Sequence, residues 1–174
     1  MLVEYYFLSD DGQFPNNELP VVVYKTAWKL SFLFPAAFIA RKFKKNNWTN
    51  TWQNCVYGYQ HYHSTAHEVL GVYKGETKLQ LGGENGKVIT LKKGDVIVIP
   101  AGVAHKNLTP ENDFKCVGAY PSGSNYDLNY GKPGERPLTD KNIVEVPLPS
   151  KDPVLGISGP LLMKWKVSVN SLVA

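Results

Sequence analysis

The residues of this sequence whose types and spacing could do chemistry are its histidines. The chain has four, and three of them, His61, His63 and His67, fall within seven residues, while His105 stands apart. On a strand, side chains two residues apart point to the same face, so His61 and His63 can converge on one ion. Imidazole suits Zn, Cu, Fe and Ni. The spacing therefore indicates a metal site.

His67 and Glu68 are the candidates for the next ligand. They follow a plausible bend and are the first residues of the next predicted strand. Adjacent strand residues face opposite ways, so both should not point inward. We favour Glu68, because a carboxylate beside imidazoles makes a mixed nitrogen and oxygen site suited to Fe, Mn, Ni, Zn or Cu. His67 would then face outward or support a ligand, although periodicity alone does not force this choice.

His105 is the predicted fourth ligand. It follows the stretch Pro100-Ala101-Gly102-Val103-Ala104, a turn that can carry the chain back after the apolar strand Val96–Ile99. One divalent transition metal held by His61, His63, Glu68 and His105 is the resulting hypothesis.

The elements that must position these residues are strands. Between residues 51 and 120, short segments rich in Val, Ile, Leu, Tyr and Thr alternate with Gly, Asn, Asp and Pro, which is typical of an all-β fold. Residues 78–81 alternate polar with apolar, and residues 82–86 supply a turn. Val96–Ile99 is apolar on both alternations and predicts a strand covered on both faces.

Two other segments flank this core. Pro35–Lys45 predicts a short helix, with Pro at its first position and basic residues at its end. Residues 121–137 are dense in turn formers. They either form an ordered covering loop, anchored or brought to a ligand by Tyr126, Tyr130, Lys132 and Arg136, or simply wrap the barrel wall. The tail is rich in proline, so we expect it to be extended, with residues 161–165 as a last strand.

The chain is predicted to be a single domain over residues 1–174. Residues 1–50 would hold an N-terminal strand arm and the short helix, residues 51–120 the barrel core, and residues 121–174 a covering loop and C-terminal extension. The segment of residues 2–8 is apolar enough to be a strand added to a neighbour's sheet, so we expect a homodimer.

Charge and composition exclude several classes. Lys and Arg number 19 against 15 Asp and Glu, and four of the basic residues lie between Arg41 and Lys45. Because the excess is local, nothing in the charge calls for a nucleic acid or membrane partner. The sequence starts without a secretory signal, and its longest apolar stretch is far short of the ~20 residues of a spanning helix. Cys55 and Cys116 are too few for a disulfide framework, so we expect a cytoplasmic protein.

At two places the sequence resembles the cupin family. The pattern His61-x-His63, four residues, Glu68, six residues, Gly75 is similar to the first cupin motif. The pattern Gly94, five residues, Pro100-x-Gly102, two residues, His105 is similar to the second. The resemblance implies a jelly-roll barrel, or double-stranded β-helix, with one or two short flanking helices, and a metal bound by His61, His63, Glu68 and His105.

The sequence departs from the cupin pattern at two positions. Cys55 stands where a Gly is usual, and Thr109 stands where an Asn is usual, with Asn107 nearby. These positions are structural in cupins, so the departures concern local turns more than the metal. Cys55 could lie close to the site as a redox-sensitive thiol.

Residues 61–73 and 127–137 further resemble the YjlB-type group of single-domain bacterial cupins, which implies no particular reaction. The expected function is metal-dependent chemistry on a small molecule, by dioxygen activation, isomerisation or decarboxylation. The alternative is a barrel that binds a small ligand or metal without turnover, or whose histidines merely pack. Polar residues that could recognise a ligand from the strands are Tyr57, Tyr59, Gln60, Tyr73, Gln80 and Lys106.

Overall fold

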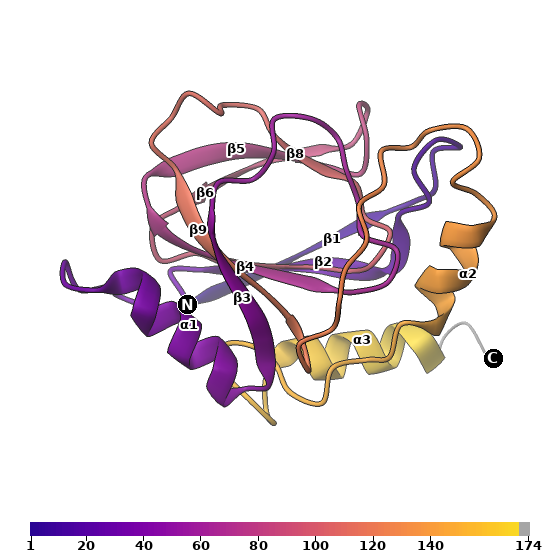
Figure 1. Cartoon of the computed structure of the whole chain (residues 1–174). Helices are drawn as coiled ribbons and strands as arrows, with labels where there is room; N and C mark the ends of the chain where they lie inside the picture. Colours follow the sequence, from indigo (N-terminus) through magenta and orange to yellow (C-terminus); the bar gives the residue numbers. More distant parts are fainter. Residues whose placement is uncertain (171–174) are drawn as a thin grey trace.

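The protein folds as two antiparallel β-sheets that face each other and enclose a barrel interior (Figure 1). The computed structural model describes residues 1–170. The larger sheet has the strand order β1-β2-β7-β4-β9-β3 and the smaller the order β6-β5-β8. The strands are β1 (Leu2–Leu8), β2 (Asn17–Lys25), β3 (Trp48–Asn54), β4 (Glu68–Lys74), β5 (Glu76–Leu81), β6 (Lys87–Lys92), β7 (Val96–Ile99), β8 (His105–Asn107) and β9 (Lys115–Pro121).

The central strands of the larger sheet, β2, β4, β7 and β9, are buried on both faces, which explains their continuous apolar runs. In β7, Ile97 and Ile99 pack inside the barrel with Leu79 and Leu81 of the smaller sheet. Val96 and Val98 point the opposite way and join a second apolar cluster on the outer face. The prediction of a strand covered on both faces at Val96–Ile99 is therefore confirmed.

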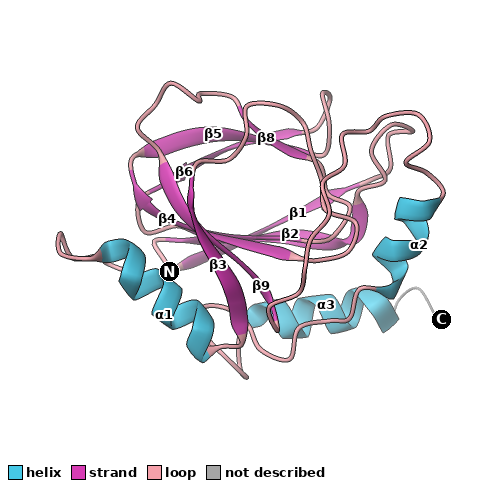
Figure 2. Cartoon of the chain, viewed as in Figure 1, coloured by secondary structure: helices cyan, strands magenta, loops and turns pink. Residues whose placement is uncertain are grey.

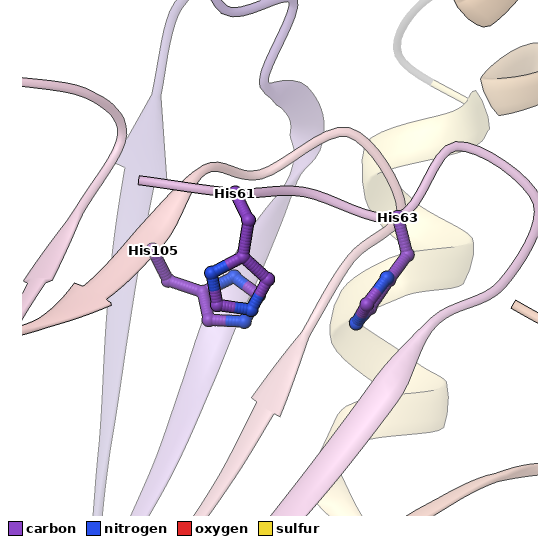
Figure 3. A group of neighbouring side chains, drawn as sticks. All are labelled: His61, His63 and His105. Carbon is purple, nitrogen blue, oxygen red and sulfur yellow. The ribbon is translucent and has the colours of Figure 1, made fainter. Parts of the chain in front are cut away.

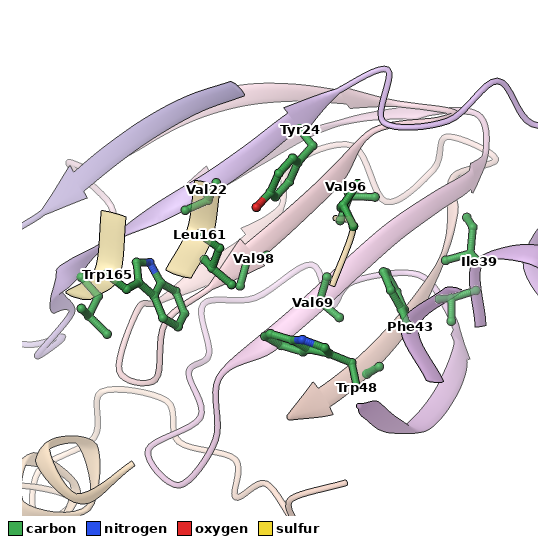
Figure 4. Close-up of a cluster of buried hydrophobic side chains, with 14 residues drawn as sticks. Val22, Tyr24, Ile39, Phe43, Trp48, Val69, Val96, Val98, Leu161 and Trp165 are labelled. Carbon is green, nitrogen blue, oxygen red and sulfur yellow. The ribbon is translucent and has the colours of Figure 1, made fainter. Parts of the chain in front are cut away.

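Two helices cover the outer face of the larger sheet (Figure 2). Helix α1 (Pro35–Lys45) has the predicted bounds and buries Ile39 and Phe43. Helix α3 (Pro160–Asn170) buries Leu161 and Trp165 against β2. Figure 4 shows these side chains in one layer with the outward valines of β2, β4 and β7.

The prediction that residues 161–165 form a last strand is wrong, because they lie in α3. Pro160 occupies the start of the helix, where proline is tolerated. Leu161 and Trp165 are four residues apart and so lie on one face of the helix. The carboxylate of Asp152 accepts a hydrogen bond from the Leu161 amide at 3.2 Å and another from the Tyr24 hydroxyl of β2, which fixes the helix start to the sheet.

The described residues contain three helices instead of the expected one or two. The additional helix α2 (Leu138–Glu145) follows the segment of residues 121–137, which runs over one end of the barrel. The segment of residues 2–8 does form a strand, and β1 pairs with β2 of its own chain at one edge of the larger sheet. None of the described helices is long and apolar enough to cross a membrane.

Candidate metal centre

His61 and His105 are positioned by a reciprocal pair of backbone hydrogen bonds. The His61 amide donates to the His105 carbonyl at 3.2 Å, and the His105 amide donates to the His61 carbonyl at 2.9 Å. Residues paired in this way present their side chains on the same side. The two imidazole rings accordingly lie 4.2 Å apart, centre to centre, and both point into the barrel (Figure 3).

His63 is held by the segment of residues 121–137, hereafter the covering segment. Its Nδ1 lies 2.5 Å from the carbonyl oxygen of Asp127. The Asp127 carboxylate in turn accepts hydrogen bonds from the Ser64 amide at 2.6 Å and from the Ser64 hydroxyl at 2.5 Å. Tyr62, between the two histidines, exchanges backbone hydrogen bonds with Asn129 at 2.9 and 3.0 Å. The covering segment is therefore ordered against the site, as one of the two alternatives for it expected.

Glu68 enters the barrel from the first position of β4. Its neighbour Val69 faces the outer apolar cluster, so the alternation of the strand turns Glu68 inward. One carboxylate oxygen, Oε1, accepts a hydrogen bond from the Tyr120 hydroxyl at 2.8 Å. The other, Oε2, lies 3.7 Å from Nε2 of His63 and 3.5 Å from Nε2 of His105. The carboxylate thus divides its oxygens between a protein donor and the histidines.

The four predicted site residues are brought together and buried. His61, His63 and His105 each offer a ring nitrogen, and these atoms lie within 4.8 Å of one another. All three histidines and Glu68 are at most 6% exposed. Side chains from a connecting segment, from β4 and from β8 therefore converge on one point of the interior.

The donor set fits a cation. In each of the three histidines, Nδ1 lies beside a backbone carbonyl oxygen, of Tyr59 at 3.1 Å, of Asp127 at 2.5 Å and of Val103 at 3.1 Å. A carbonyl oxygen only accepts, so Nδ1 carries the proton and a neutral ring keeps the Nε2 lone pair free. Such orientation of a histidine through its other nitrogen is the usual support of a metal ligand. Lone pairs that converge beside a carboxylate repel one another unless a cation lies between them.

The electrostatics of the site differ from one residue to the next. Burial, with the neighbouring charge of His105, lowers the pKa of His61 from 6.5 to about 3, so that ring is neutral. Burial also acts to lower the pKa of His63, but the charge of Glu68 outweighs it and raises that pKa above its ordinary value. Burial acts against ionisation of Glu68, yet His63 and His105 hold its pKa below the ordinary range. The carboxylate is therefore ionised in the interior.

His67 does not belong to the converging set. Its ring packs on Trp165 of α3, 4.7 Å between ring centres, on the outer side of the sheet. Its Nδ1 accepts a hydrogen bond from the Ala101 amide at 3.0 Å. Burial lowers the pKa of His67 to about 3, so the ring is neutral. This histidine links the turn before His105 to the C-terminal helix.

A cavity of about 200 Å³ opens onto the four residues. Its wall includes Trp52 and Tyr120, which the sequence did not single out, and Tyr126 of the covering segment, which it did. Of the six polar candidates named from the sequence, Tyr57 lines the cavity, whereas Gln80 bonds to the Glu84 carbonyl and Lys106 pairs with its carboxylate. Tyr59, Gln60 and Tyr73 are not among the described lining residues.

The two departures from the motifs have different consequences. Cys55 lines the cavity as a free thiol, as the sequence allowed. Thr109 keeps the turn after β8, because its hydroxyl lies 2.9 Å from that of Thr77 and accepts a hydrogen bond from the Lys78 amide at 3.2 Å. The side-chain oxygen of Asn107 accepts a hydrogen bond from the Thr109 amide at 2.9 Å. Hydroxyl and amide groups thus replace the usual Asn in this turn.

Fold and site together define a jelly-roll protein with a buried histidine cluster that could bind a metal. Comparison with known proteins agrees: a model of the family described as "Cupin domain" matches residues 54–117. The protein described as "Uncharacterized protein YjlB" of Bacillus subtilis (strain 168) is 44% identical over 161 residues, covering 92% of this chain and 94% of that protein. The chain belongs to the cupin family, in its YjlB-type bacterial group, and the resemblance seen in the motifs is confirmed.

Solved structures match this chain with lower sequence identity. Acireductone dioxygenase from Bacillus anthracis, with a cadmium ion in its active centre, has a TM-score of 0.41 and 14% identity, covering 74% of this chain and 83% of that chain. Procruciferin, an 11S globulin from Brassica napus, has a TM-score of 0.37 and 21% identity over 48% of this chain. This chain spans about a fifth of the globulin's length, 21%.

Proposed function

We propose that this protein binds one divalent transition metal ion through His61, His63, Glu68 and His105 and uses it as an enzyme acting on a small molecule. The observation that carries the proposal is the convergence of three Nδ1-protonated imidazoles on a buried carboxylate. The adjoining cavity supports access by a small molecule. A closed structural site would leave no such space.

The residues of the chain have separate tasks in this proposal. The carbonyls of Tyr59, Asp127 and Val103 hold the proton on Nδ1 and turn Nε2 inward. Tyr120 holds one oxygen of Glu68, so the carboxylate presents only Oε2 to the histidines. When bound, a divalent ion supplies Lewis acidity and lowers the pKa of a coordinated water or hydroxyl.

The donor set is compatible with Fe, Mn, Ni, Zn or Cu. Within the proposal, the chemistry is of the oxidoreductase, isomerase or decarboxylase type, all of which need a bound substrate beside an open metal position. In an alternative role, Glu68 would loosen from the metal and serve as a base toward such a substrate, since it lines the cavity and is ionised.

The test is the metal content of protein purified without a histidine tag, measured by elemental analysis beside His63→Ala. We expect close to one equivalent of transition metal in the protein and its loss in the variant. His67→Asn is the matched control, since it removes a buried histidine outside the site while keeping an acceptor near the Ala101 amide. Absence of metal from the unmodified protein, even after anaerobic reconstitution, would contradict the proposal.

We also propose that the protein is a homodimer that pairs through β1. This strand lies at the edge of the larger sheet and exposes Leu2 and Phe7 by 62% and 61%. An exposed apolar edge strand invites pairing with a second chain. Light scattering at micromolar concentration should give twice the chain mass, and a clean monomer mass would count against the dimer.

A further inference from the structure

The loop that leads into α1 carries three large apolar side chains in a row that are open to solvent. Phe32, Leu33 and Phe34 are 92%, 69% and 80% exposed. In Figure 1 this loop projects beyond the start of α1 and away from the barrel. None of the three belongs to the apolar clusters formed by the described residues. Single exposed apolar residues are ordinary on a protein surface, whereas adjoining ones mark an interaction site.

The loop borders a groove whose wall is both apolar and basic. The groove has a volume of about 470 Å³, and its wall includes Leu33, Phe34, Ala37 and Phe38 together with the cations Lys29 and Arg41. Neither Asp nor Glu occurs among the described residues that line it. Two cations therefore lie beside exposed apolar side chains with no carboxylate in the groove to neutralise them.

The exposed face of α1 extends this positive charge. Arg41 is three residues before Lys44 and four before Lys45, so the three side chains lie on one face of the helix. All three are exposed, as is Lys29. In the part of the chain that the structure describes, none of these four cations takes part in an ion pair. Their charge is therefore available to an anionic partner.

The sequence around this surface lacks acidic residues altogether. From Leu19 to His67 the chain contains six Lys or Arg residues and no Asp or Glu. Lys25 pairs with Asp95, and the other five cations lie in the loop and in α1. The total charge of the chain does not call for a membrane partner, but the placement of these cations around an apolar loop does. Apolar side chains flanked by cations suit the boundary between acyl chains and anionic headgroups.

A second copy of the chain suits this surface less well. In a two-fold symmetric pair the same patch meets itself, so the cations of one copy would face the cations of the other. The three apolar side chains would bury on the order of 500 Å², less than the roughly 800 Å² per partner of a stable interface. An anionic surface avoids both difficulties.

We propose that this protein docks on lipid bilayers that contain anionic phospholipids, through residues 29–34 and the exposed face of α1. Phe32, Leu33 and Phe34 enter the boundary of the acyl chains, while Lys29 and the cations of α1 face lipid phosphates. The described residues of the groove and those of the cavity beside the histidines do not overlap. Docking and metal binding can therefore be tested independently.

The test measures binding of the full chain to lipid vesicles by co-sedimentation. Vesicles of phosphatidylcholine alone are compared with vesicles of phosphatidylcholine mixed with phosphatidylglycerol, which is anionic. We expect binding to the mixed vesicles, much weaker binding to phosphatidylcholine alone, and a fall in affinity as salt screens the exposed charges. Equal binding to the two kinds of vesicle, or binding to neither, would overturn the proposal.

A double variant tests the apolar part of the docking surface. Phe32→Ser with Leu33→Ser keeps every cation, and affinity for the mixed vesicles should fall at least about tenfold, because apolar side chains stabilise the docked state when they leave water. Val144→Ser with Ile157→Ser is the matched control, since these residues are equally exposed elsewhere on the chain. Unchanged affinity of the loop variant would contradict insertion. A lower mass of the loop variant in light scattering would show that the loop joins two copies, and would overturn the proposal.

A second double variant tests the charge. Arg41→Gln with Lys44→Gln should lower affinity for the mixed vesicles by about 30-fold, since each cation near an anionic surface contributes about fivefold. Lys87→Gln with Lys141→Gln removes the same charge from exposed positions in β6 and α2, and it should bind like the unmodified protein. An equal loss in the two double variants would mean that the total charge of the protein drives binding, and the docking surface would be wrong.

Discussion

The two halves of the site are built by different means. Glu68 and His105 stand at the first positions of β4 and β8, where ladder hydrogen bonds to β7 and β5 fix the backbone. His61 and His63 lie on a segment outside the named strands, held by isolated bridges and by the covering segment. Strand-borne residues are oriented by register. On the segment, His61 depends on its isolated bridge to His105, and His63 depends on its contact with Asp127, 64 positions along the chain. The comparison predicts that the two halves fail in different ways.

The largest effect is expected in the strand-borne half. Glu68→Gln keeps the shape of the side chain and its place in β4, but removes the negative charge that faces His63 and His105. Metal affinity should fall by more than the roughly 10–100-fold cost of losing an outer partner of a ligand. The dissociation constant for Co²⁺, measured in competition with a chromophoric chelator, gives this number.

Glu84→Gln is the matched control, because this exposed carboxylate pairs with Lys106 and lies away from the histidines. Its metal affinity should equal that of the unmodified protein. If Glu68→Gln bound Co²⁺ as tightly as Glu84→Gln, the carboxylate would not be a ligand.

A substitution in the covering segment should lower both the metal affinity and the stability of the protein. Asp127→Ala removes the acceptor of the Ser64 amide and hydroxyl, so the backbone carbonyl that faces His63 is no longer fixed. We expect metal affinity to fall by about 10–100-fold and stability by about 1–3 kcal/mol. Chelator competition and urea unfolding of the metal-free protein measure the two effects separately.

Asp113→Ala serves as the control for this change, since Asp113 is an exposed carboxylate paired with Lys74. It should alter neither quantity by much. An unchanged metal affinity in Asp127→Ala would mean that the segment of the first cupin motif positions His63 without help from the covering segment.

The same contrast explains what could be predicted from the sequence. Alternation along strands indicated that His67 and Glu68 would not both point inward, the ligand chemistry of a carboxylate beside imidazoles favoured Glu68, and the two motifs placed His105 on the same interior. The contacts of Asp127 with Ser64 join residues 63 positions apart in a segment with no periodicity, so no local pattern could indicate them. Tyr120 gave no signal either, because its hydroxyl reaches Glu68 only through the register of β4 and β9.

The C-terminal helix was missed for another reason. Three prolines upstream of it, Pro147, Pro149 and Pro153, favour extended chain, and that preference was carried past Pro160. The spacing of Leu161 and Trp165 did hold a helical signal, and α3 buries both. Local preference was overridden by packing on the outer face of the sheet, where Trp165 donates a hydrogen bond to the Pro20 carbonyl at 2.9 Å.

A smaller loss of metal affinity is expected when the hydrogen bond from Tyr120 to Glu68 is removed. Tyr120→Phe removes the hydroxyl that donates to Oε1, leaving that buried oxygen without its partner. Metal affinity should fall by about tenfold, the lower end for loss of such a support. Tyr73→Phe, which removes a hydroxyl from a ring packed on the outer cluster, is the control. Equal Co²⁺ affinities of the two variants would show that Tyr120 does not position the carboxylate.

The smallest effect is expected from removing the ion pair near the C-terminal end of the covering segment. Arg136 donates to the Asp10 carboxylate, with Nη1 2.9 Å from Oδ1, and its Nε pairs with Asp140 of α2 at 2.9 Å. The hydrogen bond from Arg136 lowers the pKa of Asp10 below its ordinary value. A carboxyl group whose pKa is lowered by folding stabilises the protein above its unfolded pKa of about 4, and this contribution is lost as the pH falls through the lowered value.

Asp10→Asn should therefore cost at most about 1 kcal/mol near neutral pH, as expected for a half-exposed ion pair, and the cost should shrink as the pH falls below about 4. Urea unfolding of both proteins at pH 7 and at pH 3 measures the difference. Because neither Asp10 nor Arg136 is among the described residues that line the cavity, Co²⁺ affinity at pH 7 should not change. If Asp10→Asn lost as much Co²⁺ affinity as Asp127→Ala, the covering segment would position His63 as one rigid unit that depends on the contacts of Asp127 and of Arg136 alike.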